Sequence, residues 1–237
     1  MSKIVRFAND DFYRRRAKQL LENAIVAFGD QEYEVALDEI EVAKRLDEKN
    51  AEIYFYSAII KSLLELDGAV EDHKKAVDLE PKNSNYKLWY GISLFSNNKN
   101  EEARDVLEEL YYKRPEEPKA KLYFLRTLMR LEEFTKVINL LNGLQVDYLS
   151  TKEMELLGVA FYETEEYDNC LYIFEEKIPQ EKLKTRSYHY ICDSYIQLGK
   201  YDEAIEFLDK LSSSGESGRF VEKYRESIEF LKKLEED

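Results

Sequence analysis

The stretch LGKYDEAIEFLDKL, Leu198–Leu211, decides the fold because its pattern recurs along nearly the whole chain. Its alanine, Ala204, has an equivalent residue 34 positions earlier, and similar steps continue toward the N-terminus. The resulting column reads Ala36, Ala69, Ala103, Val137, Cys170 and Ala204, with gaps of 33, 34, 34, 33 and 34 residues. A fixed period of this length is typical of repeat proteins, in which one supersecondary unit stacks on the next.

Large and small residues recur in register with this column. Three residues before its members stand Tyr33, Leu66, Asn100, Phe134, Tyr167 and Tyr201. Twelve residues before them stand Ala24, Ser57, Gly91, Leu125, Gly158 and Cys192, which we name the small column. Two closely packed backbones leave no room for a long side chain, so we interpret the small column as a helix–helix contact. One unit is therefore written about six times.

Each unit is predicted to be two helices joined by a short turn. Leu157 and Phe161 have helical spacing, and after a polar break the spacing resumes with Tyr167, Cys170 and Phe174. Turn signals such as Gly199-Lys200 fall inside units, and Glu80-Pro81-Lys82-Asn83 separates two units. Short breaks favour antiparallel neighbours, which predicts an all-α fold.

The pattern resembles the tetratricopeptide repeat (TPR) family, most specifically in AVEDHKKAVDLEPKN, Ala69–Asn83, and in Leu198–Leu211. The resemblance implies a right-handed α-solenoid, a superhelix of about six helix-turn-helix units in which the first helix of each unit lines a concave groove. The expected units are 17–49, 50–83, 84–117, 118–150, 151–184 and 185–218.

The two ends of a stacked array need caps. Residues 219–237 are expected to form a C-terminal capping helix with one apolar stripe, made of Phe220, Tyr224, Ile228 and Leu231. Residues 1–16 are expected to be an N-terminal extension that starts the first helix, with Asn9-Asp10-Asp11 as its cap. Arg14, Arg15 and Arg16 are interpreted as a solvated face, and their role stays open.

Composition excludes several classes of protein. The 237 residues include 49 Asp and Glu against 35 Lys and Arg, a formal charge of −14 that disfavours a nucleic-acid partner. No apolar run reaches the roughly 18 residues of a membrane span and the start lacks a signal-peptide core, so we expect a cytoplasmic chain without membrane association. Two cysteines, Cys170 and Cys192, make neither a disulfide framework nor a four-sulfur zinc site.

The search for catalytic or metal-binding residues predicts no enzyme, no metal and no cofactor. The motifs GxxxxGK[ST], GxGxxG, HExxH and GxSxG are all absent. His73 stands where other units have a large packing residue, so a structural role is favoured, and both cysteines are interpreted as buried, inert thiols. His189 and Asp193, four residues apart on one predicted helix, leave an acid–base or metal-binding pair as the enzymatic alternative.

The function is expected on the groove that the resemblance implies. First-helix positions outside the packing columns repeat aromatic residues and carry basic ones, an arrangement unlike a surface meant only for water. The predicted partner-binding residues are Tyr54, Phe55, Trp89, Phe95, Lys119, Tyr123, Arg126, Arg130, Lys152 and Tyr162. The alternative is that these rings pack against neighbouring first helices inside a tightly wound superhelix.

The leading hypothesis is a non-enzymatic adaptor or scaffold that holds a peptide or helix of another protein. Residues 84–150 carry 10 basic and 10 acidic groups, whereas the flanking segments carry net charges of −5 and −9. We therefore expect a partner with an aromatic or aliphatic anchor and an acidic group near Arg126 and Arg130. The alternative hypothesis is a structural or self-associating subunit, a homo-oligomer formed through the same aromatic surface.

The resemblance also implies a test for one known partner class, the acidic tails of chaperones, which some family members hold with a two-carboxylate clamp. That clamp needs Lys and Asn on one first helix, Asn on the next, and Lys and Arg on the third. The matching positions here are Leu21, Ile25, Phe55, Asn85 and Trp89. A chaperone-tail adaptor is therefore disfavoured.

Overall fold

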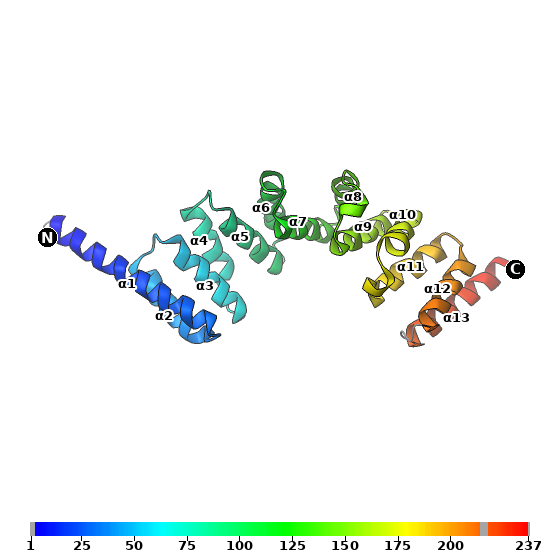
Figure 1. Ribbon diagram of the computed structural model, residues 1–237, viewed down its shortest axis with the longest axis horizontal. Helices are drawn as coiled ribbons and strands as arrows, with labels where there is room; N and C mark the ends of the chain where they lie inside the picture. The colour runs from blue at the N-terminus through cyan, green and yellow to red at the C-terminus, as the bar shows by residue number, and fades with distance from the viewer. Residues whose placement is uncertain (1–2, 214–217, 237) are drawn as a thin grey trace. The chain divides into compact units, whose positions relative to one another are not determined.

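The computed structural model describes residues 3–213 and 218–236, with side chains for 11–213 and 218–234, and every regular element in these ranges is helical (Figure 1). The all-α prediction is confirmed. Two compact units are present, Met1–Thr127 and Leu128–Asp237, which we name unit N and unit C and describe separately. No helix in the described ranges combines the length and apolarity that a membrane crossing requires.

Unit N is built from consecutive helices that pack as neighbours in the order of the chain (Figure 1). Their bounds are α1 Lys3–Gly29, α2 Tyr33–Leu46, α3 Ala51–Leu63, α4 Ala69–Leu79, α5 Ser84–Ser96 and α6 Asn100–Lys113, followed by α7 Pro118–Arg130, which contains the boundary between the units.

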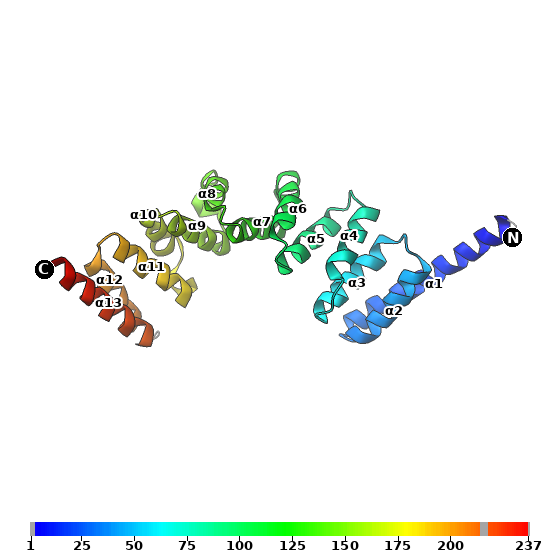
Figure 2. The same cartoon turned by 180° about the vertical axis from the view of Figure 1, so that it is seen from behind.

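Unit C continues the same pattern (Figure 2). Its helices are α8 Phe134–Asn142, α9 Thr151–Glu163, α10 Tyr167–Leu171, α11 Thr185–Gln197, α12 Tyr201–Ser213 and α13 Gly218–Glu236, with 3₁₀ turns η1 Val146–Tyr148 and η3 Gln180–Lys182 and a π-helical segment η2 Tyr172–Lys177. The predicted C-terminal helix is present as α13, where Val221 and Ile228 are buried.

Side-chain caps fix the starts of several first helices. Asn50 accepts from the Glu52 amide at 3.0 Å and so begins α3, and Asn83 caps α5 in the same way. Ser150 and Glu153 form a capping box at the start of α9. These caps satisfy amide groups that the first turn of a helix leaves without a partner, and each typically contributes about 1 kcal/mol.

The turn inside each pair of helices uses a left-handed residue with the period of the sequence. Gln31, Glu65, Asn98, Glu132 and Glu165 have φ between 54° and 64°, and Gly199 has φ 66°. Only glycine adopts this conformation without steric cost. The five turns without glycine therefore carry mild backbone strain, which the packing of the helices on either side offsets.

All six residues of the small column are buried, and the structure corrects the predicted reason. A Cβ on Gly91 would lie 2.7 Å from Cδ2 of Leu107, and one on Gly158 would lie 2.6 Å from Cε2 of Phe174. The small residue thus receives a large side chain from the second helix of its pair, rather than a second backbone.

The first helix is longer than predicted. It begins at Lys3, so Asn9-Asp10-Asp11 lies inside α1 and does not cap it. At 1.5 Å per residue α1 is about 40 Å long and α2 about 21 Å, so the first turns of α1 extend beyond α2 (Figures 1 and 2). Arg14, Arg15 and Arg16 are exposed there.

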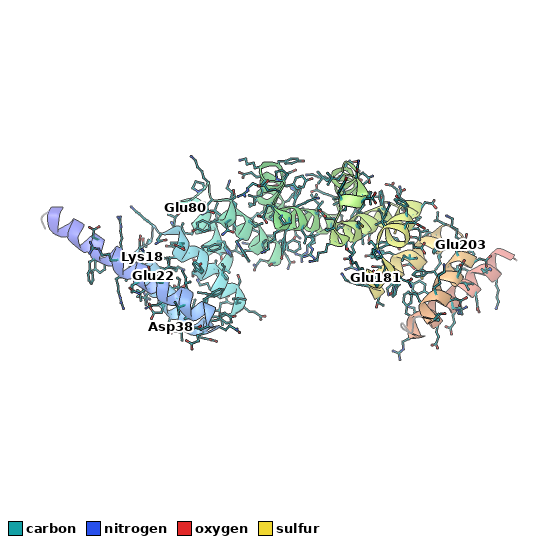
Figure 3. All side chains as sticks on the ribbon, viewed as in Figure 1. Lys18, Glu22, Asp38, Glu80, Glu181 and Glu203 are labelled. Carbon is teal, nitrogen blue, oxygen red and sulfur yellow. The ribbon has the colours of Figure 1, made fainter. Side chains whose placement is uncertain are left out.

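Most charged residues coat the outer faces of the helices. The side chains labelled in Figure 3 are all exposed, namely Lys18, Glu22, Asp38, Glu80, Glu181 and Glu203. Charged side chains at such exposed positions keep the surface hydrated.

Candidate protein-binding surface

The rings of α3 and α5 form one packed group in unit N. Phe55 lies 4.9 Å from Tyr86 and 6.5 Å from Trp89 between ring centroids. Phe55 is only 8% exposed because Tyr86 and the core alanines Ala51 and Ala76 surround it. The expectation that Phe55 presents its ring to a partner is therefore corrected: it is a core residue that supports Trp89.

Trp89 is half-buried and keeps part of its surface accessible. The ammonium group of Lys119, at the start of α7, lies 5.5 Å from the centre of its ring. Because Lys119 is exposed, this cation–π contact contributes on the order of 0.5–1 kcal/mol. Another cation could therefore replace the Lys119 ammonium group on the Trp89 ring.

A second pair of rings joins α5 to α7. Phe95 and Tyr123 meet edge to face with centroids 5.4 Å apart, and both are half-buried. The guanidinium of Arg126 lies 5.8 Å from the Tyr123 ring, and Arg126 has no ion pair to a residue that the structure describes. Lys119 and Arg126 thus present positive charge beside partly open rings.

Tyr54 lies beside a buried network of charges. Lys44 Nζ is 5.3 Å and Lys75 Nζ 6.0 Å from the centre of its ring. Lys44 and Lys61 both hold the carboxylate of Asp72, with Nζ–O distances of 2.9 and 2.8 Å. Burial, followed by the nearby carboxylate of Glu48, raises the pKa of the Tyr54 hydroxyl.

A pocket of about 1000 Å³ opens between the α3–α4 turn and α5. Trp89 lines it together with Ile92, Ser93 and Lys99. From the other side come Glu65–Gly68 and the first turns of α4, including His73. Gly68, with φ 88°, is the N-cap of α4 and provides no side-chain cap.

Two buried polar side chains, His73 and Ser93, line this pocket. Ser93 is 6% exposed, and its Oγ reaches no donor or acceptor in the described chain. His73 is 2% exposed, and its ring packs on Phe55 with centroids 6.0 Å apart. Burial lowers the pKa of His73 to about 4, against the opposing effects of the Asp72 carboxylate and the Ala69 backbone. The imidazole is therefore neutral at pH 7.

The remaining predicted binding residues, Arg130, Lys152 and Tyr162, belong to unit C. Arg130 and Lys152 are exposed. Tyr162 is half-buried and packs edge to face on Tyr190, with centroids 5.0 Å apart, and burial raises the pKa of its hydroxyl to about 12. A binding role for these three residues stays a prediction.

The pair named as the enzymatic alternative is joined through a third residue. Tyr224 on α13 donates its hydroxyl proton to Asp193 Oδ1 at 2.9 Å, and His189 Nδ1 lies 2.9 Å from the Tyr224 hydroxyl oxygen. No cluster of three or more His, Cys, Asp or Glu in the described ranges is arranged to hold a metal ion. The arrangement ties α13 to α11, which is a structural task.

Comparison with known proteins fixes the fold. No family model and no curated protein matches the sequence. A tetratricopeptide repeat protein from Parabacteroides merdae superposes with a TM-score of 0.69 at 16% identity, covering 94% of this chain and 89% of its own. The type IV pilus biogenesis factor PilW gives 0.64 at 19%, covering 87% and 97%. Pseudomonas aeruginosa PilF gives 0.60 at 16%, covering 90% and 97%.

The chain has the TPR fold. Within this chain, paired helices, a left-handed turn residue and a buried small column recur with the period of the sequence in unit N and unit C. The fold is generally a protein–protein interaction module and usually non-catalytic, and the partner of this chain is a separate question.

The pocket beside Trp89 was not predicted from the sequence, because part of its wall comes from the turns between helices. The columns of first-helix residues include Trp89, but they do not include Gly68 or Lys99, which lie between helices. One signal was available: His73 breaks a column of apolar residues, Ile40, Leu107, Leu141, Phe174 and Leu208, which marks a polar group at a packing position.

Proposed function

We propose that unit N is a non-enzymatic interaction module that holds a segment of another protein on the first-helix surface around Trp89 and Tyr123. The observation that carries the proposal is the exposed or half-buried set of Trp89, Lys119, Tyr123 and Arg126 beside a large pocket. The proposed adaptor or scaffold role and a cytoplasmic location rest on the sequence and stay predictions.

The partner segment has an aromatic or aliphatic anchor and an acidic group. The anchor contacts the open part of Trp89, and the carboxylate pairs with Lys119 or Arg126 through charge-assisted hydrogen bonds. Two or three buried apolar anchors contribute about 1.5–3 kcal/mol each, and association costs roughly 4–15 kcal/mol. Three anchors at the upper value and a few kcal/mol from the charged contact, set against the lowest cost of association, give about −8 kcal/mol, so a micromolar dissociation constant is the tightest expected for one segment.

Affinity capture from the native cell lysate tests this function. The intact protein is compared with Trp89→Ala and Arg126→Ala, and with Tyr148→Ala as a control that removes an aromatic ring, 82% exposed, from unit C. Partners that both unit N variants lose and the control keeps support the proposal. Circular dichroism and melting curves verify that each variant is folded.

Equal recovery of partners by all variants would remove the surface around Trp89 from consideration. Light scattering on the purified protein addresses the alternative, self-association through the same rings. A homo-oligomer that Trp89→Ala converts to a monomer would replace the adaptor proposal with that alternative.

A further inference from the structure

The pocket beside Trp89 carries more negative than positive charge. Glu65, Asp67 and Glu71 line it, and none of them makes an ion pair with the residues that the structure describes. Lys99 is the cationic residue among those that line the pocket. Three carboxylates against one ammonium leave a net charge of −2 at the wall, because His73 is neutral.

The N-terminus of α4 opposes this charge but does not reverse it. The free amide groups of a helix N-terminus are equivalent to about half a positive charge. The wall therefore keeps a net charge of about −1.5, which favours a cation over an anion. Lys61 lies close to Gly68, but its charge is matched by Asp72 at 2.8 Å and Glu41 at 3.2 Å.

The uncharged part of the pocket suits a flat cation with many donors. Ser93 Oγ is a buried acceptor whose hydrogen bond is unmade within the described chain. Trp89 offers an aromatic ring, and Lys119 already shows that this ring attracts a cation. A guanidinium group combines charge, five donors and a planar face that stacks on indole.

We propose that this pocket receives an arginine side chain of the bound partner segment. The inference rests on the proposed function, since it assigns the chemistry of one residue in the segment that unit N holds. The guanidinium lies among Glu65, Asp67 and Glu71 at the turn, and the acidic group of the segment lies toward Lys119 and Arg126. The partner thus carries charges of both signs on either side of its apolar anchor.

The chain reports on this pocket directly because Trp89 is its single tryptophan. The purified full-length protein is titrated with N-acetyl-arginine amide at low ionic strength while Trp89 fluorescence is followed. We expect saturable binding with a dissociation constant on the order of 1 mM. N-acetyl-citrulline amide, which has the same shape without the charge, binds at least fivefold more weakly.

The carboxylates are tested with a matched pair of triple variants. Glu65→Gln, Asp67→Asn and Glu71→Gln together are expected to weaken binding of the arginine amide at least tenfold. The control triple Asp38→Asn, Glu181→Gln and Glu203→Gln changes the net charge equally at exposed positions and leaves the affinity within twofold. All six positions are exposed, so both variants keep the fold.

Three outcomes overturn the inference: no saturable binding, equal binding of citrulline and arginine amides, or equal weakening by the two triple variants. Tighter binding of N-acetyl-glutamate amide would do the same, because it would mean that the α4 N-terminus governs the pocket. The lysate comparison with Trp89→Ala is independent of these titrations. A partner lost there without arginine binding leaves the proposed function in place and removes this inference alone.

Discussion

Asp72 on α4 accepts a hydrogen bond from Lys61 on α3, with Lys61 Nζ 2.8 Å from Asp72 Oδ2. Lys44 on α2 and Ser57 reach the same carboxylate at 2.9 and 2.7 Å. Burial alone would raise the pKa of Asp72, but the hydrogen bonds from Lys61, Lys44 and Ser57 outweigh it and lower the pKa. One carboxylate therefore joins three consecutive helices of unit N.

Replacing Asp72 by Asn should destabilise unit N by about 3–5 kcal/mol, since it leaves two largely buried ammonium groups without their main partner. The control Asp202→Asn removes an exposed ion pair with Lys232 and should cost less than about 1 kcal/mol. Urea unfolding of both variants measures the difference. Similar midpoints would show that the network adds nothing to stability.

Gly91 and Gly158 should not tolerate a methyl group. Alanine gains up to about 1 kcal/mol of helix propensity, but its Cβ would overlap Leu107 or Phe174, both of which are fully buried. We expect Gly91→Ala and Gly158→Ala to lose about 1–3 kcal/mol in urea unfolding. Gly29→Ala is the control, since a Cβ there meets no atom within 4 Å, and it should be neutral or stabilising.

The sequence predicted the helices well because the period repeats a packing relationship, not a local propensity. Ala36 and its five equivalents are all buried at the contact between paired helices. The left-handed turn residue was unreadable, since five of six positions hold Gln, Asn or Glu rather than glycine. Tertiary packing fixes the conformation there, against the preference of the residue itself.

Unit C shows where a strict period fails. Lys177 lies seven residues after Cys170, a position at which other units have the buried residues Ala43 and Leu211, yet its ammonium group pairs with Asp147 at 3.0 Å. Ile178, one residue later, is buried instead. The π-helical segment Tyr172–Lys177 adds the extra residue to the turn and so shifts the register by one, which spacing alone does not reveal.

The candidate site was predicted in part. Trp89, Phe95 and Tyr123 are half-buried, as a binding surface requires, whereas Phe55 is covered. Positions in one column have different neighbours here: the Tyr86 ring packs on Phe55, whereas the exposed ammonium group of Lys119 lies over the half-buried Trp89. The column alone carries no information about these neighbours.

The free energy of unfolding should fall at acidic pH because His73 takes up a proton more readily in the unfolded chain. Burial lowers its folded pKa to about 4, below the ordinary value of 6.5, so the unfolded chain binds more protons between these values. Stability is therefore full above pH 6.5 and declines as the pH falls toward 4. Between pH 7 and pH 5 we expect a loss of about 2 kcal/mol in urea unfolding.

The variant His73→Leu should abolish this part of the pH dependence, because it places at the site the residue that several other units carry. His189→Gln serves as the control and should retain it, since His189 is exposed. A pH dependence that persists unchanged in His73→Leu would assign the effect to other groups.

The two cysteines should be unreactive in the folded protein. Cys170 and Cys192 are fully buried, and burial raises the pKa of each thiol to about 12. Only the thiolate is a good nucleophile, so iodoacetamide at pH 8 should label neither residue within an hour. In 8 M urea both should react, and mass spectrometry counts the adducts. Rapid labelling of the native protein would contradict their burial.

Tyr224 should act as the main polar link between α13 and α11. The single hydroxyl proton of Tyr224 goes to Asp193, so His189 Nδ1 is the donor in its hydrogen bond to the Tyr224 hydroxyl oxygen. Tyr224→Phe keeps the ring contact with Phe220 but removes both hydrogen bonds, which should cost about 1–3 kcal/mol since one partner is charged. Hydrogen exchange of the α13 amides should accelerate at least fivefold in this variant. Ser227→Ala, which changes an exposed hydroxyl on the same helix, should leave exchange unchanged, and equal rates in the two variants would mean that apolar packing alone holds α13.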